Sequence, residues 1–117
     1  MKRVYVAGKY NGPDVLSVLS NMRRGIDLSI QVIEIGMAPF SPWLDFQFGL
    51  QADIQMSVYK ECSMAWVSVC DALILVPGWE NSNGVKAEIE EAKKHGIPVF
   101  TSIRDLTHYV FPKKASK

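Results

Sequence analysis

A run of five apolar residues at positions 72–76, Ala-Leu-Ile-Leu-Val, limits the folds open to this chain more than any other segment. Asp71 precedes the run, and Pro77 and Gly78 end it. A short strand that is apolar on both sides is typical of a parallel sheet covered by helices on both faces. The run therefore predicts a buried parallel strand in an α/β domain.

Other strands and helices are predicted to alternate along the chain. Strands are expected at residues 3–7, 37–40 and 97–100, the first central in the sheet and the last towards an edge because of Pro98. Helices are expected at about residues 15–35, 53–69, 82–95 and 105–109, with a loop at residues 41–49. The alternation predicts an α/β fold with a doubly wound parallel sheet of four to five strands, a Rossmann-like or flavodoxin-like three-layer sandwich.

The apolar positions of the first two long helices predict which faces pack on the sheet. In the first helix, which Asp14 should cap, the expected buried stripe consists of Val15, Leu19, Met22, Ile26, Ile30 and Ile33. In the second helix, the expected buried face consists of Val58, Cys62, Ala65, Trp66 and Val69. We expect both faces to lie in the core.

The length and charge of the chain limit its number of domains and the kinds of partner it can bind. The 117 residues predict one domain at residues 1–112 and a flexible basic tail at residues 113–117. A net charge of +1 with interspersed signs argues against a nucleic-acid polymer as partner.

Because there is no signal peptide and no apolar run of roughly 18 residues, we predict that the protein does not bind or span a membrane and that it is cytoplasmic, or lies in a host cytoplasm if the gene is viral. Cys62 and Cys70 should be reduced, and neither they nor the two histidines have metal-site spacing, so no metal and no cofactor is predicted.

Ligands of open α/β sheets bind beyond the carboxyl ends of the strands, where three loops of this chain should meet. These loops span residues 8–12, 40–49 and 77–84. In the first, two glycines and Lys9 precede a helix and either cradle a phosphate or form a tight turn. In the third, Ser82 is expected to cap the next helix, to bind a phosphate oxygen, or both.

Glu88 is the most informative polar residue of the predicted third helix. Val85, Ile89 and Ala92 define its buried stripe, and Glu88 lies roughly 60° from the centre of that stripe. Glu90 and Glu91 point away and should form surface pairs with Lys94. Glu88 is therefore either a functional carboxylate with a perturbed pKa, or a residue that reaches solvent or pairs with Lys9 or Arg104.

Three segments carry a resemblance to a known family. They are Val-Tyr-Val-Ala-Gly at residues 4–8, Cys-Asp-Ala-Leu-Ile-Leu-Val-Pro-Gly-Trp-Glu at 70–80, and Ser-Asn-Gly-Val-Lys-Ala-Glu at 82–88. Together they resemble the nucleoside 2-deoxyribosyltransferase-like superfamily, and most closely a bacterial and phage-associated branch of it. The resemblance implies that Glu88 attacks the anomeric carbon of a nucleoside or nucleotide and forms a glycosyl-enzyme intermediate, as in retaining glycosidases.

The resemblance also implies roles for other residues. The loop after the first strand would bind sugar and phosphate, and Ser82 would help to hold a 5′-phosphate. Relatives carry an aspartate three residues before the tryptophan that matches Trp66, whereas this chain has Ser63, which cannot protonate a leaving base. The candidate acids that would replace it are Glu61, Asp45, Asp53 and Glu80. The candidate catalytic residues are thus Glu88, Ser63 and Glu61, and the candidate substrate-binding residues are Gly8, Lys9, Tyr10, Gly12, Phe40, Asp45, Trp79, Ser82 and Gly84.

Three functions remain open from the sequence. The leading one is N-glycosidic cleavage or transfer on a nucleoside or nucleoside 5′-monophosphate. The alternatives are a non-catalytic nucleotide-binding or sensing module, favoured by Ser63, and an interaction subunit. The subunit would use the aromatic residues Trp43, Phe46, Phe48 and Trp79. The resemblance implies a homodimer or higher homo-oligomer.

Overall fold

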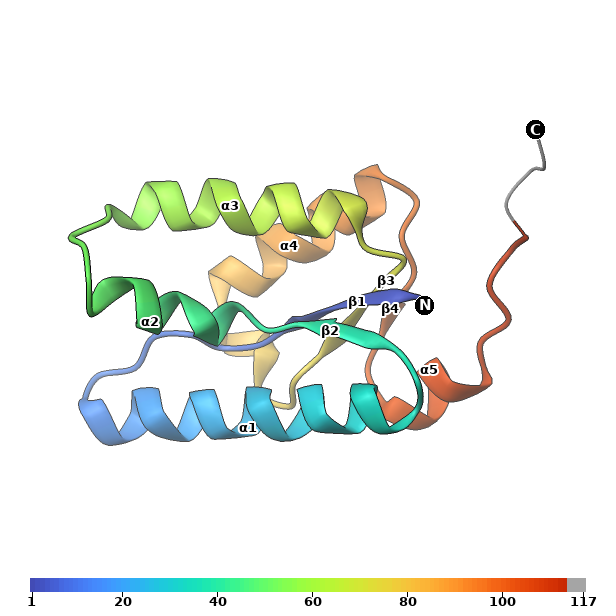
Figure 1. Ribbon diagram of the computed structural model, residues 1–117, viewed down its shortest axis with the longest axis horizontal. Coiled ribbons are helices and arrows are strands. Elements are labelled where there is room, and N and C mark those ends of the chain that lie inside the picture. Colours follow the sequence, from blue (N-terminus) through green and yellow to red (C-terminus); the bar gives the residue numbers. More distant parts are fainter. Residues whose placement is uncertain (114–117) are drawn as a thin grey trace.

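The computed structural model describes residues 1–113 and contains a four-stranded, all-parallel sheet in the order β2-β1-β3-β4. The strands are β1 (Arg3–Ala7), β2 (Ala38–Phe40), β3 (Ala72–Leu75) and β4 (Val99–Phe100). The helices are α1 (Val15–Glu34), α2 (Asp45–Gly49), α3 (Met56–Val69), α4 (Asn83–Lys94) and α5 (Ile103–His108), with short 3-10 turns η1 (Pro42–Leu44) and η2 (Trp79–Asn81). Helices α1 and α5 cover one face of the sheet, and α3 and α4 cover the other (Figure 1). The predicted doubly wound α/β fold is confirmed.

Some boundaries differ from the prediction. Residues 41–49, expected as a loop, form η1 and α2, because Pro42 suits the first position of a helical turn and Asp45 suits the first turn of the helix that follows. The expected tail at residues 113–117 lies, apart from Lys113, outside the described residues. No helix within residues 1–113 is long and apolar enough to cross a membrane.

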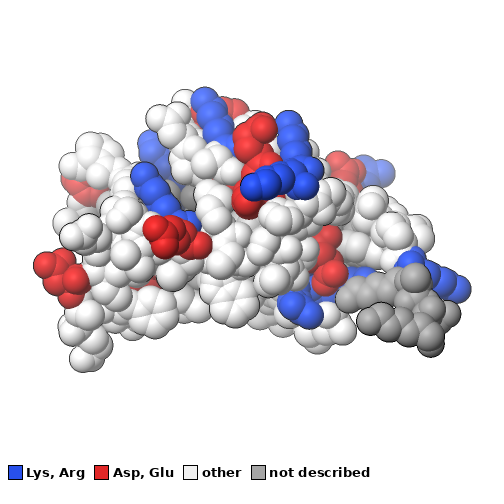
Figure 2. Space-filling view, turned by 90° about the horizontal axis from the view of Figure 1, so that it is seen from above, with Lys and Arg blue, Asp and Glu red and all other residues white. Residues whose placement is uncertain are grey.

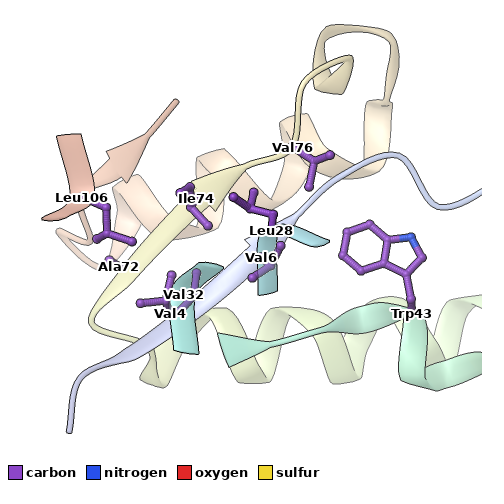
Figure 3. Close-up of a cluster of buried hydrophobic side chains, with 9 residues drawn as sticks. All are labelled: Val4, Val6, Leu28, Val32, Trp43, Ala72, Ile74, Val76 and Leu106. Atoms are coloured by element: carbon purple, nitrogen blue, oxygen red, sulfur yellow. The ribbon is translucent and has the colours of Figure 1, made fainter. Parts of the chain in front are cut away.

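Side chains of the central strands alternate between two cores. Val4, Val6 and Ile74 face α1 and α5, where they pack against Leu28, Val32 and Leu106 (Figure 3). Tyr5, Ala7, Leu73 and Leu75 face α3 and α4, where they pack with Val67, Val85 and Ala92. Every residue of β3 is buried, which is the reason for its continuous apolar sequence.

The predicted buried stripe of α1 is wrong. The residues that face the sheet are Asn21, Gly25, Leu28, Ser29 and Val32. The expected stripe is rotated by roughly 110° at 100° per residue. Apart from Met22, which packs partly buried against the core, it lies at the surface, where Val15, Ile30 and Ile33 are 72%, 48% and 59% exposed. Gly25 lies on the inner face because the ring of Trp43 packs directly against this position and leaves no room for a side chain.

The predicted buried face of α3 is also wrong. Val67 is its one buried residue, whereas Trp66, expected in the core, is 49% exposed and stacks on Phe40 with ring centroids 5.0 Å apart. Cys62 is exposed, and Cys70 is buried. The inner side of α3 instead carries Ser63 and Met64, which line a cavity and so need not be a continuous apolar stripe.

On the face covered by α3 and α4, basic and acidic side chains are interspersed (Figure 2). Neither sign forms a stripe on that face, which is the pattern the sequence predicts.

Candidate active site

A cavity of about 400 Å³ opens at the carboxyl ends of β1 and β3. Its walls come from the loop after β1, the start of α2, the inner side of α3 and the segment that joins η2 to α4. This volume falls within the range of sites for small organic ligands. The location is the one predicted for a parallel α/β sheet.

Glu88 lies in the wall of this cavity. Helix α4 begins at Ser82, whose hydroxyl oxygen accepts a hydrogen bond from the backbone N–H of Val85 at 3.2 Å. The buried residues of the helix are Val85, Glu88 and Ala92. Val85 and Ala92 belong to the predicted stripe, whereas its third member, Ile89, is only partly buried and Glu88 takes its place. Glu88 is only 9% exposed, and within the described part of the chain it pairs with neither Lys9 nor Arg104.

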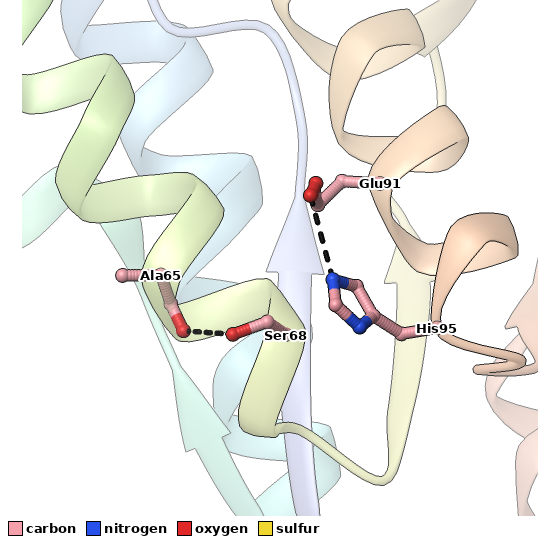
Figure 4. Close-up of polar contacts among 4 residues, drawn as sticks. All are labelled: Ala65, Ser68, Glu91 and His95. Carbon is pink, nitrogen blue, oxygen red and sulfur yellow. Dashed lines mark hydrogen bonds and ion pairs between the residues drawn. The ribbon is translucent and has the colours of Figure 1, made fainter.

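Of the two neighbouring glutamates of α4, Glu90 is exposed as predicted, whereas Glu91, also expected at the surface, is partly buried. Glu90 pairs with Lys93 at 3.8 Å, and Glu91 pairs with His95 at 3.5 Å (Figure 4). The expected partner of both, Lys94, belongs to neither ion pair.

Tyr5 is a site residue that the sequence reasoning missed. Its hydroxyl donates a short hydrogen bond to Oε2 of Glu88. The sequence does carry a signal for it, because a tyrosine in an otherwise aliphatic buried strand brings a hydroxyl that needs a partner in the core. β1 places it opposite Leu73 of β3, on the face that α4 covers.

Burial changes the acidity of both partners. It raises the pKa of Glu88 to about 7; hydrogen bonding from Tyr5 opposes this rise, and the charge of Asp45 adds to it. Burial, followed by the charge of Glu88, raises the pKa of Tyr5 far above its usual range, while Ser63 acts in the opposite direction. Tyr5 therefore remains a donor, and Glu88 exchanges its proton near neutral pH.

Asp45 is the one proposed replacement acid that lines the cavity. Burial raises the pKa of its carboxyl above the usual value. Glu61, Asp53 and Glu80 are exposed and lie outside the cavity wall. Ser63 does line the wall, so the position where relatives are expected to carry an acid faces the same space as Glu88.

Most of the candidate substrate-binding residues also line the cavity. Those that do, besides Asp45, are Gly8, Lys9, Tyr10, Ser82 and Gly84. A side chain at Gly8 would meet Val76 at 2.7 Å, so this glycine is also required for close packing.

Gly12, Phe40 and Trp79 do not line the cavity. A side chain at Gly12 would meet Cβ of Ser17 at 2.6 Å, so this glycine packs the loop onto α1. Phe40 stacks on Tyr5 with ring centroids 5.4 Å apart, and Trp79 packs against the core beneath α3 and α4.

The aromatic surface expected for a partner is not formed as predicted. Trp43 is 3% exposed and belongs to the core, because its ring fills the space beside Gly25 and its Nε1 donates to the carbonyl of Lys9 at 3.3 Å. Phe46 stacks on Tyr10 with ring centroids 4.5 Å apart, and Phe48 is 56% exposed. Within residues 1–113, no cluster of three or more histidine, cysteine, aspartate or glutamate side chains is placed to hold a metal ion.

Comparison with known proteins identifies a matching family profile and a solved structure with a similar fold. A family profile described as a domain of unknown function, DUF4406, matches residues 2–101. A solved 2-deoxyribosyltransferase from the psychrotolerant bacterium Bacillus psychrosaccharolyticus is similar with a TM-score of 0.61 and 12% identity over 93% of each chain. No protein with a curated description matches the chain. The structural likeness shows a shared fold, which the sequence resemblance had implied.

Proposed function

The chain belongs to the DUF4406 family, and from this premise and the geometry of its cavity we propose that it cleaves or transfers the N-glycosidic bond of a nucleoside or nucleoside 5′-monophosphate. The observation that carries the proposal is Glu88, a buried carboxylate oriented by Tyr5 in the wall of a cavity of nucleoside size. The 2-deoxyribosyltransferase fold supports the same chemistry. Membership of a bacterial and phage-associated branch stays a prediction.

Glu88 acts as the nucleophile. Because Tyr5 donates to Oε2, Oε1 is the oxygen that attacks C1′ of the sugar. The C1′–N bond breaks, its electron pair goes to the base, and the sugar becomes an ester of Glu88. Water then attacks C1′ and gives the free sugar, or a second base attacks and gives a new nucleoside; either step returns the carboxylate of Glu88.

Asp45 supplies the acid that Ser63 cannot. Its carboxyl protonates the departing base, and the resulting carboxylate takes the proton from the attacking water or base. Burial raises the pKa of Asp45, but its charge contributes to the raised pKa of Glu88, so Asp45 ionises before Glu88. The first step therefore uses the fraction of molecules in which Asp45 is protonated and Glu88 is ionised. Asp45 on α2 and Glu88 on α4 line the same cavity, which supports their assignment as the two carboxyl groups that a retaining glycosyl transfer needs.

Lys9, Ser82 and Gly84 bind the 5′ end of the substrate. Lys9 contributes a positive charge, and the start of α4 contributes backbone N–H groups beside the Ser82 hydroxyl. Tyr10 offers an aromatic wall that Phe46 supports by stacking. This arrangement favours a nucleoside 5′-monophosphate over an unphosphorylated nucleoside.

The proposal is tested by release of free base from a panel of ribo- and deoxyribonucleosides and their 5′-monophosphates, separated by liquid chromatography. We expect at least one member to be cleaved, and a second free base in the mixture to show whether transfer competes with hydrolysis. Binding of a nucleotide in calorimetry with no base released from any member would contradict the enzyme and support a nucleotide-binding module.

The Asp45→Asn variant should lose activity in proportion to how much the base needs a proton. With an ordinary purine or pyrimidine, we expect base release to fall about a hundredfold, the typical contribution of a general acid. With a 7-methylguanine nucleotide, whose base leaves without being protonated, the rate should remain close to that of the wild type. Glu61→Gln, an exposed carboxylate outside the cavity, is the matched control. An equal loss on both substrates would show that Asp45 does not act as the acid.

We also propose a homodimer or higher homo-oligomer that uses the exposed apolar stripe of α1. In an antiparallel arrangement centred on Ile26, Leu19 of one copy faces Ile33 of the other. Arg23 then lies near Asp27 of the second copy, so the charges at the edge of the stripe are complementary.

A further inference from the structure

A second cavity, of about 470 Å³, lies on the opposite side of the loop after β1. It is bounded by the first half of α1 and by Pro77 and Gly78 after β3. Lys9 and Asn81 line both this cavity and the candidate active site. A ligand that passes Lys9 can therefore occupy both spaces.

Arg24 is held in the wall of the second cavity by a buried polar residue. Asn21 is 5% exposed, and its Oδ1 accepts a hydrogen bond from Nη2 of Arg24 at 2.7 Å. The Nδ2 of Asn21 donates to the carbonyl of Asn11 at 3.1 Å, which fixes the amide between the loop and the helix. Because Asn21 is itself fixed, its hydrogen bond orients the guanidinium of Arg24 before any ligand binds.

The cavity carries an excess of positive charge. Arg24 and Lys9 both line it, and neither is in an ion pair within residues 1–113. Asp14 is the carboxylate in the wall, but it caps α1, where its Oδ1 accepts from the N–H of Ser17 at 2.7 Å. Hydrogen bonding from Ser17 lowers the pKa of Asp14. One carboxylate that is already engaged leaves the two cations available to an anion.

We propose that the second cavity binds phosphate groups, with Arg24 and Lys9 as the cationic ligands and Ser17 and Ser20 as hydroxyl donors. A planar guanidinium matches the oxygens of a phosphate in a bidentate arrangement, and an ammonium group adds a point charge. The phosphate belongs either to a free anion or to the distal end of a nucleoside 5′-diphosphate or 5′-triphosphate. The second source rests on the proposed function, since the sugar of that nucleotide would lie beside Glu88, and it widens the substrate class beyond monophosphates.

The test is calorimetric titration of the full chain with inorganic pyrophosphate, a deoxynucleoside 5′-monophosphate and the matching 5′-diphosphate. Arg24→Gln should weaken pyrophosphate binding about tenfold or more, the usual effect of losing a charge-assisted hydrogen bond pair. Arg104→Gln is the matched control, because Arg104 is an exposed arginine that lines neither cavity, and it should leave binding unchanged. In the wild type, the diphosphate should bind about tenfold more tightly than the monophosphate, and Arg24→Gln should remove that advantage.

Two results would overturn parts of this inference. Equal pyrophosphate binding by the wild type and Arg24→Gln would eliminate the phosphate site. Pyrophosphate binding that depends on Arg24, without tighter binding of the diphosphate, would eliminate the nucleotide as the source and leave a site for a free anion. Because these titrations do not measure base release, the phosphate site and the proposed glycosidic activity fail or succeed separately.

Discussion

The Glu88→Gln variant is expected to release base at least about a thousandfold more slowly than the wild type, because removal of a catalytic nucleophile costs factors of this size or larger. Glutamine keeps the shape of glutamate and still accepts a hydrogen bond from Tyr5, but its amide does not form an ester with C1′. The rates are compared in single-turnover reactions with saturating enzyme. Glu90→Gln changes an exposed glutamate of the same helix and should leave the rate unchanged. Turnover of Glu88→Gln at the wild-type rate would place the nucleophile elsewhere.

The pH dependence of the wild type provides a second measure of Glu88. The nucleophile must be ionised, and burial raises its pKa to about 7. The single-turnover rate on a substrate that needs no acid, such as a 7-methylguanine nucleotide, should therefore rise with pH and reach half its maximum near pH 7. A rate already constant from about pH 5 upwards would contradict a buried, proton-exchanging Glu88.

Glu88→Gln should also stabilise the fold, so a loss of activity in this variant would not be the result of unfolding. The pKa of Glu88 rises from 4.5 to about 7 on folding, so between these values the folded state binds more protons than the unfolded chain. Its contribution to stability is therefore highest below pH 4.5 and falls as the pH rises towards 7, by on the order of 3 kcal/mol. Glutamine does not ionise, so the free energy of unfolding of Glu88→Gln does not fall over this pH range. In urea denaturation the variant should be more stable than the wild type above about pH 7 and similar to it below about pH 4.5.

The sequence predicted the alternation of strands and helices and the carboxylate of α4 that lies nearest its inner face, because both follow from local periodicity. The continuous apolar sequence of β3 identifies a strand buried on both sides, and the spacing of Val85, Ile89 and Ala92 places Glu88 beside the inner stripe of α4 without deciding whether it is buried. These patterns need no knowledge of distant contacts.

The inner faces of α1 and α3 could not be read from periodicity, because distant residues determine them. On α1, the ring of Trp43 requires Gly25 on the inner side and turns the aliphatic stripe outwards. On α3, the inner face lines the cavity, so Ser63 takes a position that a packing argument assigns to an apolar residue. Tyr5 and Asp45 lie near Glu88 in the structure but far from it in the sequence, on β1 and α2. Their proximity depends on the tertiary arrangement of these elements, which local periodicity does not reveal.

Replacement of Gly25 by alanine should destabilise the protein, although alanine favours a helix interior over glycine by about 1 kcal/mol. An added Cβ at this position would overlap Cζ3, Cε3 and Cη2 of the Trp43 ring. The ring is 3% exposed and packs in the core, so it has no free space to enter. Overpacking of a core costs roughly 1–3 kcal/mol and adds to the lost contacts of the ring. We expect a net loss of about 2 kcal/mol, measured by urea denaturation, and a thermal midpoint lower by roughly 10 °C.

Gly49→Ala is the matched control, because Gly49 lies in α2, where an added Cβ would meet no atom of the described residues within 4 Å, and its replacement should be neutral or stabilising. Trp43→Leu should relieve the overlap, so the double variant Gly25→Ala, Trp43→Leu should lose less stability than the sum of the two single variants. Strict additivity would show that the side chains at positions 25 and 43 do not compete for the same space.

Because Nε1 of Trp43 also donates to the carbonyl of Lys9, displacement of the ring by Gly25→Ala should move the loop shared by both cavities. Gly25→Ala should therefore weaken binding of both a nucleoside 5′-monophosphate and pyrophosphate, whereas Arg24→Gln should weaken pyrophosphate binding and leave monophosphate binding unchanged.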